Sequence, residues 1–242
     1  MLKAFTASVY SVAFPQGCHI CGNLVEDPDD GVACRSCWQA THFFDGNETL
    51  CSKCGAVLAK LGGPQDVSCH KCDEQHYDRA IAIGIYEQGI AAGCIHLKTK
   101  PDLSKFLTRS IEHALERNNF QTERLLVPVP LSPKRRFERG FNQAEIIARV
   151  VAEQTRWTLD CLSLVRTRHT PMHRAAMDRR ARELTVEKAF KVVRPRFIAG
   201  QDVLLVDDIF TSGSTVSACA KVLKKNGAAT VDVFTVARAM IK

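Results

Sequence analysis

The sequence predicts an α/β protein in which a parallel sheet is flanked by helices and preceded by a cysteine-rich, zinc-binding module. Two observations carry this prediction. After residue 80, segments typical of strands alternate with segments typical of helices, which favours a parallel, doubly wound sheet. Before residue 73, four Cys-x-x-Cys pairs occur with the spacing of zinc ligands. We expect an N-terminal helix and two zinc ribbons in residues 1–79, and one α/β domain in residues 80–242.

The elements of the larger domain follow from the hydrophobic pattern. Short runs rich in β-branched residues predict strands, and longer amphipathic segments predict helices. In chain order, we expect strands at 80–86, 124–130, 202–208 and 230–236, and helices at 103–116, 141–154 and 214–225. The chain has 242 residues, of which 45% are hydrophobic, enough for one sizeable domain and a small module.

Most of the eleven cysteines belong to the Cys-x-x-Cys pairs, which are Cys18/Cys21, Cys34/Cys37, Cys51/Cys54 and Cys69/Cys72. The two-residue gap lets one turn direct both sulfurs at a tetrahedral ion, so two pairs complete one site and the chain predicts two zinc ions. Pairing of sequence neighbours is the simplest arrangement, and a cross-braced arrangement stays open. Because every ligand is a thiolate, we expect both sites to be structural.

The remaining cysteines and the nearby histidines are expected to have no metal role. Cys94, Cys161 and Cys219 lack the pair spacing, and we expect all three to be small buried residues. Four cysteines already complete each ligand set, so the neighbouring histidines are expected to be bystanders. These are His19, His42, His70 and His76.

The N-terminal segment helps to predict the cellular compartment of the protein. Residues 1–14 are apolar with one lysine, and no clear cleavage site precedes Pro15. We therefore expect a short amphipathic helix that caps the module, rather than a secretory signal. No stretch approaches the ~20 apolar residues needed to span a membrane. Eleven cysteines in a chain with no secretory signal are more typical of metal thiolates in a reducing cytoplasm than of a secreted disulfide scaffold.

Residues 203–215 join a buried strand, two carboxylates and a small-residue loop that opens a helix. Asp207 and Asp208 follow the apolar run Val203–Val206, at the strand end where open α/β sheets bind ligands. The loop consists of Thr211, Ser212, Gly213, Ser214 and Thr215. Its glycine lets an anion approach the backbone, and the helix directs free N–H groups toward it. The loop suits a phosphate and the carboxylates suit ribose hydroxyls, directly or through Mg²⁺, so the motif predicts a sugar-phosphate site.

Charge divides the two parts of the chain. Residues 1–80 carry 6 Lys and Arg against 10 Asp and Glu, net −4, which leaves 27 against 16, net +11, in residues 81–242. A nucleic acid would therefore bind the larger domain rather than the zinc module. The basic residues cluster at Lys134, Arg135, Arg136 and Arg139, and again at Arg166, Arg168, Arg174, Arg179, Arg180 and Arg182.

The motif at 203–215 resembles the 5-phosphoribosyl-1-pyrophosphate (PRPP) signature of type I phosphoribosyltransferases. With the cysteine pairs, Val127–Leu131 and Arg139–Gln143, nearly the whole chain resembles the ComF/GntX family, in which a double zinc ribbon precedes a type I phosphoribosyltransferase-like domain. The resemblance implies that Asp207, Asp208 and the loop 211–215 bind PRPP with Mg²⁺. It also implies a pyrophosphate-binding loop that contains Lys134, Arg135, Arg136 and Arg139.

Two further positions are carried over from the resemblance. Related transferases close a flexible loop over PRPP, and residues 166–182 match that loop by position. Arg182 matches its arginine, although neighbouring positions depart from the family pattern. Lys98 matches a family lysine, and an ordinary surface lysine is an equal interpretation.

Three functions are compatible with these features. The resemblance implies a cytoplasmic protein of natural transformation or DNA utilisation that binds PRPP and, through a basic face, single-stranded DNA, with DNA-uptake or recombination proteins as candidate partners. The alternatives are a phosphoribosyltransferase with an unidentified acceptor and a regulatory PRPP sensor. The sequence shows no obvious general base. Phe137 and Phe141 are the aromatics beside the arginines, so a stacking platform for single strands has little support.

Overall fold

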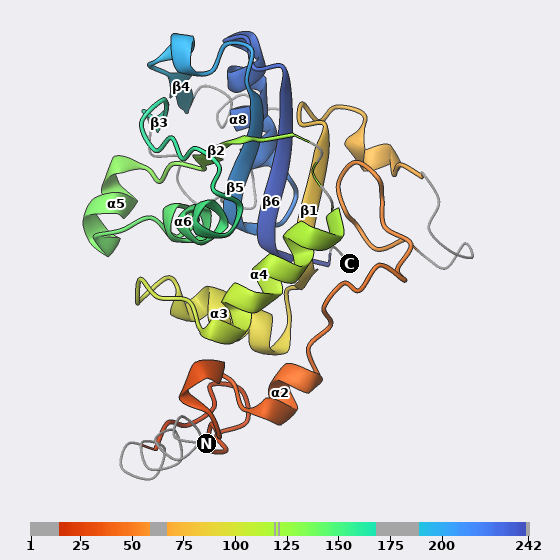
Figure 1. Cartoon of the computed structure of the whole chain (residues 1–242), viewed down its shortest axis with the longest axis vertical. Coiled ribbons are helices and arrows are strands. Elements are labelled where there is room, and N and C mark those ends of the chain that lie inside the picture. Colours follow the sequence, from red (N-terminus) through yellow and green to blue (C-terminus); the bar gives the residue numbers. More distant parts are fainter. Residues whose placement is uncertain (1–14, 59–66, 119, 121, 168–188, 241–242) are drawn as a thin grey trace, which may run out of the picture.

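The computed structural model describes residues 15–58, 67–118, 120, 122–167 and 189–240. Its centre is a four-stranded sheet in the order β1-β6-β5-β2 (Figure 1). The strands are β1 (Arg79–Ile85), β2 (Leu125–Pro128), β5 (Asp202–Phe210) and β6 (Thr230–Arg238). Each neighbouring pair is parallel, which confirms the predicted fold class.

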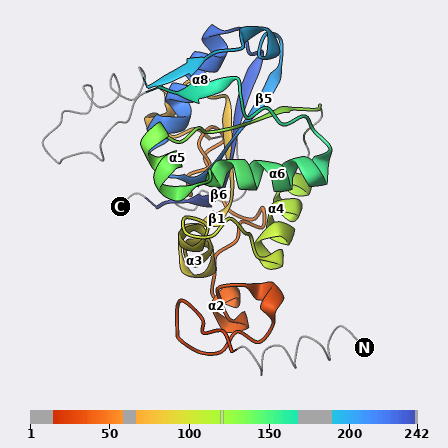
Figure 2. The same cartoon turned by 90° about the vertical axis from the view of Figure 1, so that its left-hand side faces the viewer.

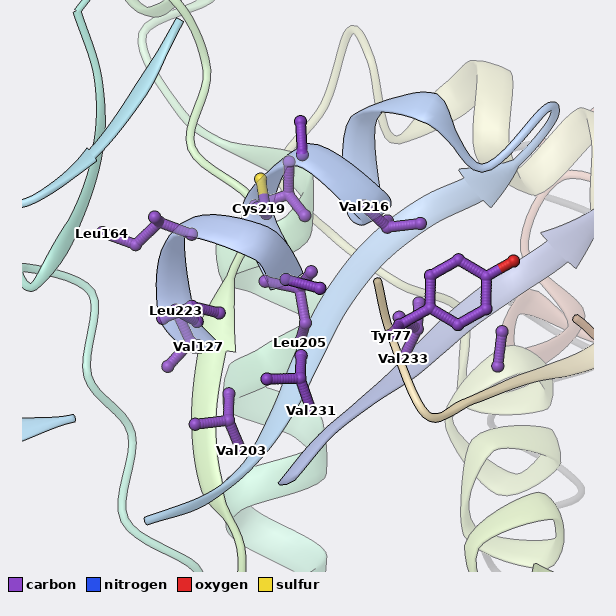
Figure 3. Close-up of a cluster of buried hydrophobic side chains, with 14 of the residues drawn as sticks. Tyr77, Val127, Leu164, Val203, Leu205, Val216, Cys219, Leu223, Val231 and Val233 are labelled. Carbon is purple, nitrogen blue, oxygen red and sulfur yellow. The ribbon is translucent and has the colours of Figure 1, made fainter. Parts of the chain in front are cut away.

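Helices cover both faces of this sheet. Successive residues of a strand point to opposite faces, so Leu204 and Val206 of β5 belong to one buried core and Val203 and Leu205 to another. Figure 3 shows the second core, in which Leu223 of a covering helix packs near Leu205. The first core lies under α3 (Gln88–His96), α4 (Lys105–Asn118) and α6 (Gln143–Thr155), and the second lies under α8 (Ser214–Lys225).

In residues 80–242, every strand and helix that the hydrophobic pattern predicts is present, with ends within a few residues of the prediction. Local signals explain the agreement. α6 begins after Asn142, whose side chain accepts a hydrogen bond from the Ala144 N–H at 3.2 Å, as N-cap residues do. α8 ends before Gly227, which has a left-handed φ of +90° that glycine adopts without strain.

The structure also contains elements that the pattern did not predict. Residues 134–139 were expected in a loop and instead lie in helix α5 (Pro133–Arg139). This helix starts because the Ser132 hydroxyl accepts a hydrogen bond from the Arg135 N–H, and it ends at Gly140, which has φ +77°. The other additions are α3, the antiparallel pair β3 (Leu164–Arg166) and β4 (Phe190–Val192), α2 (Arg35–Gln39), and the 3-10 turns η1 (Pro28–Asp30), η2 (His70–Cys72) and η3 (Pro195–Phe197).

The cysteine-rich module is joined to the outer edge of β1. The Phe44 N–H donates to the Ile83 carbonyl at 3.0 Å, and the Ala80 N–H donates to the Lys53 carbonyl at 2.7 Å. A side chain at Gly84 would put its Cβ 2.3 Å from the His42 carbonyl oxygen, so only glycine permits this approach. The module thereby covers a strand edge that would otherwise present unpaired backbone groups.

The two ribbons pack on opposite faces of the sheet. Trp38 of the first ribbon stacks on Phe106 of α4 with ring centroids 4.3 Å apart, and it belongs to the core beneath α3, α4 and α6. Cys51, Cys54 and Cys72 of the second ribbon belong to the core beneath α8. Figures 1 and 2 show α2 and the first ribbon at the end of the molecule opposite β3 and β4.

Within the described part of the chain, no helix has both the length and the apolar character needed to cross a membrane. The helix expected near the N-terminus falls in residues 1–14, which lie outside the described residues. The boundary expected between residues 79 and 80 stays a prediction.

Candidate sugar-phosphate site and zinc clusters

The two adjacent carboxylates lie within β5 rather than at its last residues. The strand continues to Phe210, and Asp207 pairs in register with Thr235 of β6. Each carboxylate is oriented by the next backbone group, because the Asp208 N–H donates to Asp207 Oδ1 and the Ile209 N–H donates to Asp208 Oδ1, both at 2.9 Å. Both side chains are partly buried, so the strand presents two fixed carboxylates at its carboxyl half.

Electrostatics make Asp207 an unfavourable place for a bare negative charge. Burial, followed by the charge of Asp208, raises the pKa of Asp207 well above its usual range, and the Arg166 guanidinium opposes that rise. A bound cation or hydroxyl donor would relieve the same unfavourable charge. Carboxylate oxygens are the ligands that Mg²⁺ prefers, so the donor set at Asp207 and Asp208 fits a divalent cation.

The loop after β5 has the geometry of an anion site. Gly213 is the N-cap of α8, has a left-handed φ of +79°, and has no side chain that could bond the first-turn N–H groups. Thr211 and Ser212 are exposed, and Ser212 Oγ lies 2.9 Å from Ser214 Oγ. The Ser214 N–H donates to Ser212 Oγ at 3.4 Å, and the other first-turn N–H groups, together with the nearby hydroxyls, suit a phosphate. The predicted loop residues are thus brought together, with Thr215 in the first turn of α8.

The basic helix α5 follows the strand next to these carboxylates. The Val129 N–H donates to the Val206 carbonyl at 2.8 Å, and the Asn142 side chain donates to the Val129 carbonyl at 3.0 Å. These bonds hold both ends of the connection that contains α5 against β5. No residue of α5 is buried, and Phe137 is 91% exposed. The helix carries the four predicted cations Lys134, Arg135, Arg136 and Arg139.

Among the described residues, acidic side chains form ion pairs with two of the four cations of this helix. Arg136 lies 3.5 Å from Glu145, and Lys134 lies 3.9 Å from Glu138, both as side-chain ion pairs. Such exposed pairs contribute little to stability, so α5 can exchange them for phosphate contacts.

Arg166, which the sequence places in the second basic cluster and at the start of the expected flexible loop, lies near the carboxylates and α5. It lies in β3, and its guanidinium carbon is 5.2 Å from the centre of the Phe190 ring. Burial, followed by the positive charge of Arg135, lowers its pKa, while Asp207 acts in the opposite direction. Arg166 therefore lies within electrostatic range of both α5 and the carboxylates. The sequence did not indicate that Arg166 would lie in a strand, and the predicted loop residue Arg182 lies outside the described residues.

The four cysteine pairs form two clusters, each built from pairs that are neighbours in sequence. In each cluster, the four sulfurs lie within 4.8 Å of one another. The Cys21–Cys34 sulfurs are 3.6 Å apart, and the Cys54–Cys69 sulfurs are 3.7 Å apart. A Zn–S bond of about 2.3 Å in a tetrahedral site requires sulfurs about 3.8 Å apart, so both sets fit zinc. The cross-braced arrangement is wrong, and neither cluster includes a histidine among the described residues.

Backbone N–H groups favour the thiolate form of Cys51 and Cys18, whereas burial raises the pKa of Cys37, Cys54 and Cys72 in the same two clusters. The Cys69 N–H donates to Cys51 Sγ at 3.2 Å. Burial opposes ionisation of Cys51, but N–H groups of Cys54, Cys69 and Lys53 outweigh it and lower its pKa to about 7. In the first ribbon, burial is outweighed in the same way and the pKa of Cys18 falls to about 6. Such donors are typical of sites that hold a metal thiolate.

The other cysteines follow the prediction with one exception. Cys94 and Cys219 are buried, as expected. Cys161 is half-buried, which corrects the expectation for that residue: it follows Asp160 in the connection between β2 and β3 and has solvent on one side.

Comparison with known proteins agrees with this architecture. Residues 9–73 match the family described as a double zinc ribbon domain, and residues 142–242 match the phosphoribosyl transferase domain family. The fold and these matches define a phosphoribosyltransferase-like protein with an N-terminal double zinc ribbon. These matches agree with the resemblance to the ComF/GntX family, in which the same two domains occur in this order.

Similar proteins match most of the chain. DNA utilization protein YhgH of Shigella flexneri is 28% identical over 86% of this chain and 90% of its own length. Competence protein F of Haemophilus influenzae is 28% identical over 85% of this chain and 90% of its own length. Competence protein ComFC of Bacillus subtilis is 27% identical over 83% of this chain and 89% of its own length. Among solved structures, the allosteric regulatory enzyme of purine biosynthesis aligns with 56% of this chain and 28% of its own, at 19% identity and a TM-score of 0.37.

Proposed function

We propose that this protein binds PRPP at the β5–α8 edge and single-stranded DNA on its basic surface, as part of DNA utilisation or natural transformation. The observation that carries the proposal is the joint position of Asp207, Asp208 and the loop 211–215 on one strand and one helix start. The names of the relatives, DNA utilization protein and competence protein, support the biological setting. Thiolate clusters support a reducing cytoplasmic location.

Each chemical group of PRPP would be bound by a different set of residues. The loop 211–215 and the first turn of α8 would receive the 5-phosphate. Asp207 and Asp208 would accept hydrogen bonds from the ribose hydroxyls. The cations of α5, with Arg166, would receive the diphosphate. Mg²⁺, when bound, would supply charge neutralisation between the diphosphate and the ribose oxygens.

The charge distribution supports DNA on the same domain. Residues 81–242 carry a net +11 against −4 in residues 1–80, and α5 presents four cations with no buried residue. A phosphate backbone binds such a surface through counterion release. Because the same cations would receive the diphosphate, PRPP and DNA are expected to compete for α5.

The decisive measurement is PRPP binding by calorimetry with and without Mg²⁺. Asp207→Ala combined with Asp208→Ala should abolish Mg²⁺-dependent binding, while zinc content and the far-ultraviolet circular dichroism spectrum stay unchanged. Glu112→Ala combined with Glu116→Ala removes the same charge from exposed positions on α4 and should leave the affinity unchanged. Equal affinity in both double variants would mean that the carboxylates of β5 have no part in binding.

A pyrophosphate assay separates this proposal from the transferase. A phosphoribosyltransferase would release pyrophosphate from PRPP in the presence of its acceptor, whereas a binding protein or sensor would retain intact PRPP. We expect no release with PRPP alone or with single-stranded DNA added. Catalytic release on adding DNA would instead identify the nucleic acid as the acceptor.

A further inference from the structure

Arg238 connects the second zinc cluster, formed by Cys51, Cys54, Cys69 and Cys72, to the phosphate loop, which is the loop 211–215. It is the last residue of β6 and is 5% exposed. Its Nη2 lies 3.5 Å from Cys54 Sγ, and its Nη1 donates to the Thr211 carbonyl at 3.4 Å. The guanidinium carbon also lies 4.1 Å from the centre of the Phe210 ring. One buried cation thus contacts a zinc ligand, the backbone of the phosphate loop and the residue that precedes that loop.

A second set of contacts joins the same two regions. Residues 75–77, which leave the second ribbon after Cys72, lie against the loop and the start of α8. The Tyr77 ring meets Phe210 edge-on, with centroids 5.7 Å apart, and the His76 N–H donates to Ser217 Oγ at 3.0 Å. Figure 3 shows Tyr77 on the sheet face that α8 covers, near Val233.

The phosphate loop fits closely against these residues. A Cβ built on Gly213 would lie 2.7 Å from Phe210 Cζ and 3.4 Å from Gln75 Oε1. Gln75 Oε1 is buried and has no hydrogen-bond partner among the described residues, so this side chain is held by packing against the loop. A displacement of residues 72–77 would therefore displace the loop as well, because close-packed contacts transmit such shifts.

The first cluster has a different environment. Cys18, Cys34 and Cys37 pack with Trp38 in the core beneath α3, α4 and α6, on the sheet face opposite α8. The two zinc sites thus differ in what they can influence, although their ligand sets are the same.

We infer that the second zinc cluster positions the phosphate loop through Arg238, so that zinc in the second site, and not in the first, sets the affinity for the ligand's phosphate. Four thiolates around one Zn²⁺ carry a net −2, and this charge and the fixed position of Cys54 hold the Arg238 guanidinium in place. Arg238 is a positioning residue in this arrangement. The inference rests on the proposed function for the ligand, but the loop geometry can be measured without it.

The test compares one cysteine variant in each cluster. Cys69→Ser removes a half-buried ligand of the second site and leaves Cys54, the ligand that is hydrogen-bonded to Arg238, in place. Cys21→Ser removes an exposed ligand of the first site. Metal analysis should show one zinc lost in each. Cys69→Ser should weaken PRPP binding about tenfold, the effect of one charge-assisted hydrogen bond, and speed amide hydrogen exchange in residues 210–217. Cys21→Ser should leave both measurements unchanged.

Variants of Arg238 test the link with both metals bound. Arg238→Gln should retain two zinc ions, weaken PRPP binding about tenfold and speed exchange in residues 210–217, and Arg238→Lys should recover part of the affinity. If Cys69→Ser does not fold, the Arg238 variants alone test whether the second cluster positions the phosphate loop. Unchanged affinity and exchange in Arg238→Gln would overturn the inference. If the unmodified protein binds no PRPP, the proposed function fails, and the exchange comparison alone still decides whether zinc positions the loop.

Discussion

Asp207 is a residue whose charge costs stability and which, under the proposed function, serves binding. Its raised pKa means that the folded state holds a proton more tightly than the unfolded state, so its contribution to stability is complete below the ordinary aspartate pKa of about 3.9 and is lost as pH rises through the raised value. At neutral pH, which lies above the ordinary aspartate pKa, Asp207 is therefore destabilising in either protonation state. Active-site residues often show this conflict between stability and function.

Asp207→Asn should consequently stabilise the ligand-free protein at pH 7 by ~1 kcal/mol. Asparagine keeps the oxygen that accepts the Asp208 N–H and removes the unfavourable charge. The gain should shrink as pH is lowered toward 4, and Mg²⁺-dependent PRPP binding should be lost. Chemical denaturation at several pH values measures the first effect. A variant that is less stable at pH 7 would contradict the electrostatic argument.

Gly213 and Gly140 form a matched pair of left-handed glycines. Their φ angles are +79° and +77°, but a Cβ at Gly213 would meet Phe210 at 2.7 Å, whereas nothing lies within 4 Å of one at Gly140. Alanine at either position pays ~1–2 kcal/mol for the left-handed backbone. Gly213→Ala should cost a further ~1–3 kcal/mol for overpacking and should weaken phosphate binding. Equal losses of unfolding free energy in the two variants would show that the loop moves freely away from Phe210.

At the scale of elements, prediction succeeded where one segment carries its own signals. Asp207, Asp208 and the loop 211–215 are contiguous, so one stretch of sequence contains the strand, the carboxylates and the helix start. Helix α8 likewise carries a start and stop that can be read locally.

The missed elements lack such signals or were interpreted through resemblance. α3 contains Gly89 and Gly93, whose missing side chains make room for Trp38 and Leu107, and small residues weaken a helical hydrophobic pattern. α5 could have been found from Ser132-Pro133 at its start and Gly140 at its end. The contacts of Arg166 and Arg238 join residues far apart in the chain, so no local pattern reveals them.

Helix α5 is expected to be the main DNA-contacting element. Arg135→Ala, Arg136→Ala and Arg139→Ala together should weaken single-stranded DNA binding and reduce the slope of log K against log salt by up to about 2, since each phosphate contact on a single strand contributes about 0.7. Arg109→Ala, Arg117→Ala and Lys225→Ala remove the same charge from exposed positions on α4 and α8. Fluorescence anisotropy at several salt concentrations measures the slope. Equal slopes for the two triple variants would indicate a diffuse electrostatic surface instead of a site on α5.

At the scale of the whole molecule, the zinc module and the α/β domain share their interior. Cys51, Cys54 and Cys72 belong to the core under α8, and Cys18, Cys34 and Cys37 belong to the core on the other face. Backbone hydrogen bonds from residues 42–53 also complete the β1 edge. The two regions differ in net charge, but they are not packed as separate bodies.

Because the two regions share their interior, residues 79–242 alone should be much less stable than the full chain. The shorter chain loses apolar partners on both sheet faces and exposes the edge of β1, a loss of several kcal/mol from a total of about 5–15. At ~2–4 °C per kcal/mol, its melting temperature should fall by at least about 10 °C. The full chain should melt in one transition, and chelating both zinc ions should lower that single transition. Calorimetry on the two proteins provides the measurement. Two separate transitions in the full chain, with residues 79–242 melting at an unchanged temperature, would mean that the module folds independently. In that case, loss of zinc from the second cluster would not change the stability of the phosphate loop.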